Sequence, residues 1–501
     1  MSDSVGRVAA IICVSALGAA LLLSCGSSAE QSGQAPRDAQ VLDSAAMSPT
    51  PAAEATHVEP EPTAEAPVVT PAPEIPTATP DSETPVADEP DQTATGVGYI
   101  EEVYTDHQRP TPASGNDAGR DSRTLRTLVV YPAAVDDASV AVEGAGPVGG
   151  PYPLVLFAHG LGGKPEWNLE LLSAIAAGGH VVVAPEFPRT SGRNSPGPDP
   201  ADTGSQPGDL SFLIDTLVQL GSDPQWPLAG MVDDSRIAAI GHSNGAITVL
   251  GIGANSCCRD ERVDAVVAMA GPPAPFDGEY DFTATPPILI IHGTKDPLIL
   301  YATSPVLFNE VSTIKGLLTL EGGDHGSWLG SGSDFFDDVV TTILDFLAVA
   351  LGGDGQAAVR LQQPRSSPNA ELVFAAEADS GLTVEVEMPE LNRQAWAEPT
   401  TGLVDGQTVV VTWSGYLPEQ TVNVLQCSQG GTEGSGACDF TNARILHPNP
   451  TGDGSVELTI IAGVVGTGVC DATVDDCVIA VNDSGILEPD ATIRIPISFA
   501  P

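Results

Sequence analysis

The sequence has few basic residues. Its 501 residues include 19 Lys and Arg against 66 Asp and Glu, which gives a formal net charge of -47. Proteins that bind nucleic acids or anionic membrane surfaces need basic patches that meet phosphate groups. The composition therefore argues against a nucleic-acid partner and against electrostatic binding to a membrane.

The sequence also lacks the spacings that are typical of metal sites. Its eight histidines are scattered, and no H-x-x-H, H-E-x-x-H or paired C-x-x-C spacing occurs. We therefore expect neither a metal ion nor another cofactor.

A hydrophobic run long enough for a transmembrane helix is missing as well. The apolar stretch from Val8 to Leu23 is short, follows Arg7 and leads into Leu22-Leu23-Ser24-Cys25-Gly26. This ending resembles a bacterial lipobox, so residues 1–24 are predicted to be a signal peptide and Cys25 the lipidated first residue of an exported, surface-anchored protein. An ordinary signal peptide, followed by secretion, is the alternative. Export would place the chain where disulfides persist.

Composition divides the rest of the chain into four parts. Residues 25–97 are rich in Pro, Ala, Thr and acidic residues and have no apolar period, which predicts a disordered tether. Residues 98–351 alternate short apolar strands with helical stretches, which predicts a mostly parallel sheet flanked by helices. Residues 352–380 are predicted to be a second linker. Residues 381–501 contain alternating strands between Gly, Pro and Asp turns, which predicts an all-β, immunoglobulin-like sandwich of about seven strands.

Near-continuous apolar runs identify the strands that should be buried on both faces of the parallel sheet. They lie at 154–158, 181–184, 236–240, 264–270 and 288–291. Helical spacing of apolar residues predicts helices at 209–220 and 335–351.

The pentapeptide Gly241-His242-Ser243-Asn244-Gly245 lies between an expected strand and an expected helix. The pattern G-x-S-x-G in this context is a nucleophile elbow, a sharp turn on which the serine has strained backbone angles and its neighbours two residues away must be very small. The turn exposes the Ser243 hydroxyl. It also directs the N–H of Asn244 at the atom on which negative charge develops during acyl transfer.

A carboxylate and a histidine follow Ser243 in chain order. Asp296 comes at the end of a buried strand, and His325 lies on a glycine-rich loop after the next strand. The order Ser, Asp, His is that of an α/β-hydrolase triad. His292 and Asp324 are the rival candidates, but His292 lies at the strand end itself, and Asp324 would point away from Ser243 if His325 points towards it.

A second oxyanion donor is expected from the loop His159-Gly160-Leu161-Gly162-Gly163, which follows the strand at 154–158. Glycines in such a loop let the backbone approach a ligand. We assign this donor to the N–H of Leu161, with that of Gly160 as the alternative, and the first donor to Asn244.

On these motifs, residues 98–351 resemble an α/β-hydrolase of the dienelactone-hydrolase-like and cutinase-like group, which includes bacterial lipases and polyesterases. The resemblance implies that Ser243 is the nucleophile, Asp296 the acid and His325 the base. True dienelactone hydrolases use a cysteine nucleophile, so the serine favours ester over lactone substrates. The aromatic clamp of the polyesterases, usually Trp, corresponds to Phe276, which is the expected substrate contact.

The expected activity is that of a serine carboxylesterase or lipase. A cutinase-like polyester hydrolase is the alternative enzyme. An alternative of another class is a non-catalytic surface protein that binds a ligand, but the complete triad in order argues against it.

Six cysteines remain once Cys13 in the signal peptide and the predicted lipidation site Cys25 are set aside. Six cysteines allow fifteen pairings, so spacing alone does not decide among them. The neighbours Cys257 and Cys258 form either a vicinal bridge or two free buried thiols.

The segments 402–409 and 424–427, with the cysteines after them, resemble the neocarzinostatin and actinoxanthin apoproteins. That family closes two short loops with disulfides, and the resemblance therefore implies two bridges. The implied pairs are Cys427 with Cys438 and Cys470 with Cys477. The family holds an enediyne in a cleft, but its ligand-lining residues are not matched here, so the resemblance implies the fold and the bridges and no ligand.

Overall fold

The computed structural model describes residues 96–114, 117–135, 140–194, 197–274, 276–389, 391–431, 437–474, 476–483 and 492–501. The predicted signal peptide, the predicted lipidation site Cys25 and nearly all of the predicted tether lie outside these residues. Within the described ranges, no helix has the length and apolarity that a membrane span requires.

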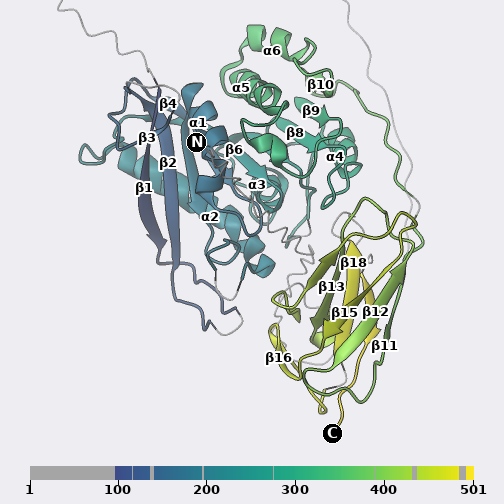
Figure 1. Cartoon of the computed structure of the whole chain (residues 1–501). Helices are drawn as coiled ribbons and strands as arrows, with labels where there is room; N and C mark the ends of the chain where they lie inside the picture. Colours follow the sequence, from purple (N-terminus) through teal and green to yellow (C-terminus); the bar gives the residue numbers. More distant parts are fainter. Residues whose placement is uncertain are drawn as a thin grey trace, which may run out of the picture. The chain divides into compact units, whose positions relative to one another are not determined.

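The larger folded part is built on one sheet, which has ten strands within the described residues (Figure 1). The strand order is β10-β9-β8-β7-β6-β4-β5-β2-β1-β3. The strands from β9 to β5 in this order run parallel, whereas β10 and β2 add to them in the antiparallel sense. Their bounds are β1 (Gly96–Asp106), β2 (Arg123–Ala133), β3 (Val142–Glu143), β4 (Tyr152–Ala158), β5 (Val181–Glu186), β6 (Val232–His242), β7 (Val263–Met269), β8 (Ile288–Gly293), β9 (Lys315–Leu320) and β10 (Ala370–Ala375).

Helices cover both faces of this sheet. They are α1 (Leu169–Ala177), α2 (Gln206–Gly221), α3 (Asn244–Ala254), α4 (Thr303–Glu310), α5 (Phe336–Gly352) and α6 (Gly355–Leu361), with the 3-10 turns η1 (Pro165–Asn168), η2 (Pro200–Ser205) and η3 (Ser327–Leu329). Successive strand residues point to opposite faces. Accordingly, Leu154 and Leu156 of β4 pack with α2 and α3, while Val155 and Phe157 pack with α1 and α5. The predicted α/β architecture is confirmed.

The predicted linker at 352–380 is wrong, because it contains α6 and the edge strand β10. The side chain of Asp354 caps α6 by accepting hydrogen bonds from the N–H groups of Gln356 and Ala357. Strand β10 pairs with β9 over its whole length, from Ala370 opposite Leu320 to Ala375 opposite Lys315. The larger folded part of the chain therefore extends beyond residue 351.

The C-terminal part is all-β, as predicted. Its strands are β11 (Gln394–Glu398), β12 (Thr408–Ser414), β13 (Val422–Cys427), β14 (Arg444–Leu446), β15 (Gly454–Thr459), β16 (Gly463–Val465), β17 (Gly468–Cys470), β18 (Val478–Asp483) and β19 (Ile493–Pro496), with the turn η4 (Gln429–Gly431). The described residues form a three-stranded sheet, a four-stranded sheet and the hairpin β16-β17. Val411 and Trp413 of β12 share one core with Val424 of β13 and Val481 of β18, which makes the two larger sheets a sandwich.

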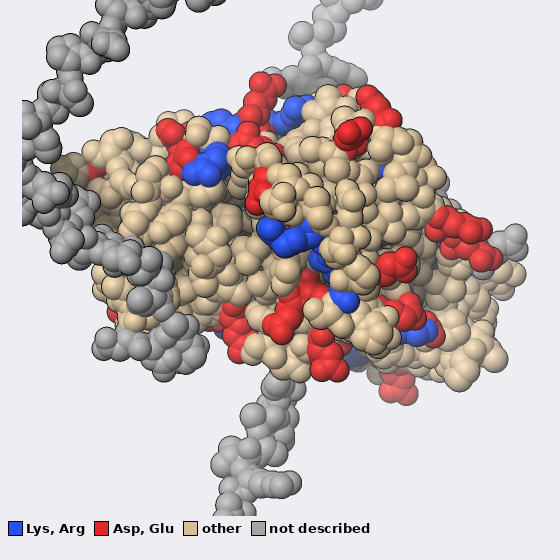
Figure 2. Space-filling model, turned by 90° about the horizontal axis from the view of Figure 1, so that it is seen from above, with Lys and Arg blue, Asp and Glu red and all other residues tan. Residues whose placement is uncertain are grey.

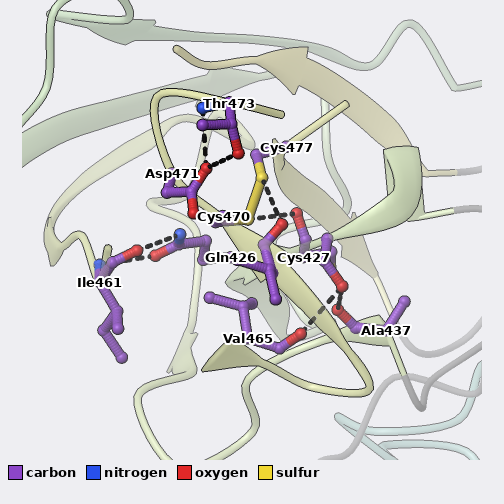
Figure 3. Close-up of a disulfide and its surroundings, with 11 residues drawn as sticks. Gln426, Cys427, Ala437, Ile461, Val465, Cys470, Asp471, Thr473 and Cys477 are labelled. Atoms are coloured by element: carbon purple, nitrogen blue, oxygen red, sulfur yellow. Dashed lines mark hydrogen bonds between the residues drawn. A yellow bond between two sulfur atoms is a disulfide. The ribbon is translucent and has the colours of Figure 1, made fainter. Parts of the chain in front are cut away.

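Two disulfides lie in this sandwich, and they join Cys427 to Cys438 and Cys470 to Cys477. Figure 3 shows the surroundings of the second bridge, where Gln426 of β13 pairs with the backbone of Ile461. Its Nε2 donates to the Ile461 carbonyl at 2.8 Å, and its Oε1 accepts from the Ile461 N–H at 2.9 Å. In the larger part, Cys257 and Cys258 are joined to each other.

Acidic side chains are spread over the face of the molecule in Figure 2, where basic side chains form only a few small groups. This distribution follows from the composition of 66 acidic and 19 basic residues.

Candidate active site

Ser243 lies on the turn between β6 and α3. Its backbone angles are φ 58° and ψ -120°, a region that residues with a Cβ rarely adopt. A Cβ added to Gly241 would lie 2.1 Å from the Gly245 carbonyl oxygen, and one added to Gly245 would lie 1.9 Å from the Ala158 carbonyl oxygen. Both glycines of the pentapeptide are therefore required by close backbone packing.

The N–H groups of the first turn of α3 lie next to Ser243. The first N–H groups of a helix have no carbonyl partner within the helix, and the helix dipole makes this end favourable for negative charge. In α3, Ala246 N–H already donates to the Ser243 carbonyl at 2.9 Å. Asn244 is the first residue of α3, so its N–H lies at this end of the helix.

The loop after β4 passes against Ser243. A Cβ added to Gly160 would lie 3.2 Å from Ser243 Cβ. The N–H of Gly162 donates to the Thr190 carbonyl at 2.7 Å, and that of Gly163 donates to the Gly160 carbonyl at 2.9 Å. These two groups are therefore occupied, and the N–H groups of Leu161 and Gly160 are the donors of this loop that can serve a ligand.

Asp296, which is buried, forms a hydrogen-bonded pair with the partly buried His325. His325 Nδ1 donates to Asp296 Oδ2 at 2.6 Å, while Asp296 Oδ1 accepts from the N–H groups of Leu298 at 2.8 Å and Ile299 at 2.9 Å. Burial by itself would raise the pKa of Asp296, but the charge of His325 and hydrogen bonds from His292 and His325 hold that pKa below its usual value. Asp296 is thus ionised and fixed in orientation.

The rival candidates have other partners. His292 is fully buried, with Nε2 donating to Asp296 Oδ2 at 3.0 Å and Nδ1 lying 2.7 Å from the Ser304 hydroxyl. Asp324 Oδ1 accepts from the N–H groups of Gly326 at 3.0 Å and Ser327 at 2.8 Å. His292 therefore supports Asp296, and Asp324 shapes the loop that follows His325.

His242, whose contact was not predicted from the sequence, joins the elbow to the His325 loop. Its Nε2 lies 2.6 Å from the His325 carbonyl oxygen, and the two imidazole rings lie 4.8 Å apart. A carbonyl only accepts, so Nε2 of His242 carries the proton. Burial, and secondly the charge of His325, lower the pKa of His242 to about 3. Within the described structure, no hydrogen bond joins the Ser243 hydroxyl to His325.

Phe276, the expected substrate contact, lies in a small buried cluster with Ile247 and Ala274. Its ring lies against the middle of α3, since a Cβ added to Gly251 would be 2.7 Å from Phe276 Cε2. Another member of this cluster, Ile247, lies one helical turn from Ser243 on α3. The substrate contact expected at Phe276 stays a prediction.

Comparisons with known proteins identify the C-terminal part. Residues 396–499 match the model of the Neocarzinostatin family. Among solved structures, the chain is similar to a ferulic acid esterase from Streptomyces cinnamoneus, with 18% identity and a TM-score of 0.43, over 56% of this chain and 97% of that chain. No curated protein matches the chain. The sandwich is thus a neocarzinostatin-family domain.

Proposed function

We propose that the chain is a serine hydrolase of carboxylic esters, an esterase or lipase that forms an acyl-enzyme on Ser243. One observation carries this proposal: Ser243, with φ 58°, directly precedes α3, and the same sheet edge carries a histidine hydrogen-bonded to a buried carboxylate, His325 with Asp296. Such a backbone conformation costs about 1–3 kcal/mol and is typical of functional sites. A scaffold that only binds a ligand would not need it.

In the proposed mechanism, His325 Nε2 takes the hydroxyl proton while Ser243 Oγ attacks the ester carbonyl. A C–Oγ bond forms, and the carbonyl electron pair moves to oxygen. The N–H of Asn244 and that of Leu161, or alternatively Gly160, stabilise this oxyanion. As the intermediate collapses, His325 gives the proton to the leaving alcohol. Water, activated by the same histidine, then releases the carboxylic acid and restores Ser243.

Asp296 is proposed as the acid of this triad, because it accepts the Nδ1 hydrogen of His325 and so presents Nε2 as the base. Asp296→Asn should therefore lower turnover strongly, whereas Asp324→Asn should have a smaller effect that comes from loosening the loop. The reverse ranking in a nitrophenyl ester assay would show that the acid has been wrongly assigned.

For the remainder of the chain, we propose export with a lipid anchor on Cys25, and a catalytic domain that runs from β1 to β10. The disulfides and the neocarzinostatin-family domain support export. Mass analysis of the N-terminal peptide of membrane-extracted protein tests the anchor. That peptide should begin at Cys25 and carry a diacylglyceryl group, and an unmodified N-terminus elsewhere would refute it.

The proposed activity is tested with Ser243→Ala on nitrophenyl esters of increasing acyl length. The variant should lose about 10³-fold or more in turnover, as is typical when a triad member is removed, with an unchanged circular dichroism spectrum. Ser235→Ala is the matched control, because Ser235 lies exposed on the same strand β6. Retention of more than about a hundredth of wild-type activity by Ser243→Ala would overturn the assignment. The chain-length series would also define the acyl preference.

A further inference from the structure

The side chain of Asn244 is held on both of its polar atoms, although the proposed mechanism uses only its backbone N–H. Thr203 Oγ1 donates to Asn244 Oδ1 at 2.9 Å, and Asn244 Nδ2 donates to Gln206 Oε1 at 3.3 Å. Thr203 and Gln206 are fully buried, and Asn244 is 3% exposed. The first residue of α3 is therefore hydrogen-bonded to Thr203 of η2 and to Gln206, the first residue of α2.

Gln206 also reaches the other half of the proposed oxyanion hole. Its Nε2 donates to the Thr190 hydroxyl at 2.6 Å, and the carbonyl of the same Thr190 accepts the Gly162 N–H at 2.7 Å. A second contact, from Gly192 N–H to the Gly163 carbonyl at 3.2 Å, fixes the same loop. One glutamine thus connects the loop that bears Leu161 with the helix that bears Asn244.

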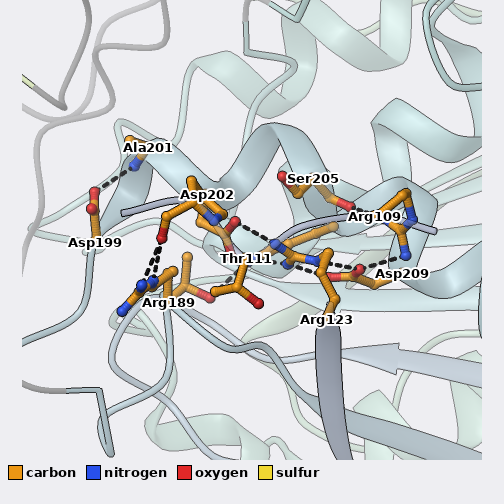
Figure 4. A network of polar contacts seen from close by, with 12 residues as sticks. Arg109, Thr111, Arg123, Arg189, Asp199, Ala201, Asp202, Ser205 and Asp209 are labelled. Carbon is orange, nitrogen blue, oxygen red and sulfur yellow. Dashed lines mark hydrogen bonds and ion pairs between the residues drawn. The ribbon is translucent and has the colours of Figure 1, made fainter. Parts of the chain in front are cut away.

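Gln206 is itself held firmly at the start of α2. Asp202 and Asp209, on either side of it in the sequence, both bind the guanidinium of Arg123, a residue of β2 that is 1% exposed (Figure 4). Arg123 Nη1 lies 2.7 Å from Asp202 Oδ1, and Arg123 Nη2 lies 2.6 Å from Asp209 Oδ2. Arg109 adds a hydrogen bond from Nη1 to the Ser205 carbonyl at 3.1 Å. These ion pairs fix the backbone on both sides of Gln206.

We propose that Gln206 is a positioning residue that sets the distance between the two oxyanion donors, with Thr190 and Thr203 as its partners. This inference rests on the proposed function of Ser243. An oxyanion hole works only when its donors are placed within about half an ångström of the productive geometry. The bonds of Gln206 link the two separate chain segments that supply these donors.

A purely structural role predicts a different behaviour. Replacing one partner of a buried hydrogen bond by an apolar group leaves the other partner unsatisfied and lowers stability. If Gln206 served stability alone, an apolar residue at 206 would therefore lower the free energy of unfolding without a specific effect on the transition state. If Gln206 is a positioning residue, a variant at 206 should bind the transition state less tightly than the wild type does and should bind the substrate equally well.

The test compares Gln206→Met with Gln219→Met, a control at an exposed position on the same helix. Turnover and KM are measured on a small soluble nitrophenyl ester, and inhibition is measured with an alkyl boronic acid, which forms a tetrahedral adduct with an active serine. We expect Gln206→Met to lower kcat by on the order of 10- to 100-fold, less than the loss of an entire donor. We expect a similar increase in the boronic acid inhibition constant and a KM within about twofold of wild type, whereas Gln219→Met should behave as wild type.

Thr190 provides a second pair of variants that does not depend on the folding of Gln206→Met. Thr190→Ser keeps the hydroxyl that Gln206 binds and should retain wild-type kcat, whereas Thr190→Val removes it and should reproduce the loss. The proposal is overturned if Thr190→Val and Thr190→Ser have the same kcat, or if kcat falls without a matching change in boronic acid inhibition.

Ser243→Ala, assayed in parallel, separates the two proposals. If Ser243→Ala is inactive while Gln206→Met and Thr190→Val keep full kcat, the esterase assignment holds and the positioning role is wrong. If Ser243→Ala remains active, the proposed function itself is wrong, whatever the Gln206 variants do.

Discussion

At the scale of single residues, three histidines lie near Asp296 and Ser243, and these histidines differ in their hydrogen-bond partners. His325 and His292 both donate to Asp296 Oδ2, at 2.6 and 3.0 Å. His242 contacts no carboxylate among the described hydrogen bonds and donates instead to the His325 carbonyl. Burial and, secondly, the charge of His325 hold His242 neutral.

This difference predicts how stability depends on pH. The pKa of His242 falls from 6.5 to about 3 on folding. Between these values the unfolded chain binds a proton at this site that the folded chain does not, so the free energy of unfolding decreases as the pH falls through that window. His242→Gln keeps an N–H donor but cannot titrate. The slope of the unfolding free energy against pH should therefore be smaller in the variant, by at most about 1.4 kcal/mol per pH unit.

Urea unfolding of both proteins between pH 4.5 and 6.5 measures this slope in a range where most carboxylates stay ionised. If the unfolding free energy of His242→Gln and that of the wild type change with pH along parallel curves, His242 is not held neutral.

The residues proposed for catalysis could be predicted from the sequence because each lies in a local pattern. Ser243 lies between two glycines, Asp296 follows an apolar strand, and His325 lies on a glycine-rich loop. Gln206 and Thr190 belong to no such pattern. Their role depends on hydrogen bonds between residues 16 and 38 positions apart, which only the folded chain reveals.

At the scale of elements, the strands buried on both faces were predicted well, because continuous apolar runs are hard to accommodate elsewhere. The edge strand β10 was missed for the opposite reason. It is only partly buried, and it follows a stretch rich in Gln, Pro and Ser whose composition resembles a linker. The packing of Phe276 on α3 could not be predicted either, because one aromatic residue does not indicate which element it packs on.

Strand β10 should stabilise the sheet. A chain that ends at Gly353 loses α6 and β10 and exposes the edge of β9, whereas a chain that ends at Ser380 keeps both. An uncovered edge strand has unpaired N–H and C=O groups and promotes association. We expect the shorter chain to have a lower Tm and to aggregate, which scanning calorimetry and light scattering will detect. Equal Tm values for the two chains would show that β10 is dispensable.

At the scale of the whole molecule, the chain combines a part built on a mostly parallel sheet with flanking helices and a neocarzinostatin-family domain that has its own core and two disulfides. The proposed nucleophile, acid and base all belong to the first of these parts. The net charge of -47 disfavours binding to nucleic acids. Because the proposed triad contains one serine, Ser243, we predict a single reactive serine in the entire chain.

The most direct test of this claim is the mass of the full chain after treatment with a nitrophenyl alkylphosphonate, which phosphonylates the nucleophile of serine hydrolases and releases nitrophenolate. We predict one added phosphonyl group on the peptide that contains Ser243, loss of esterase activity in proportion to labelling, and no labelling of Ser243→Ala. A label on another residue, or ester hydrolysis that persists in fully labelled protein, would contradict it.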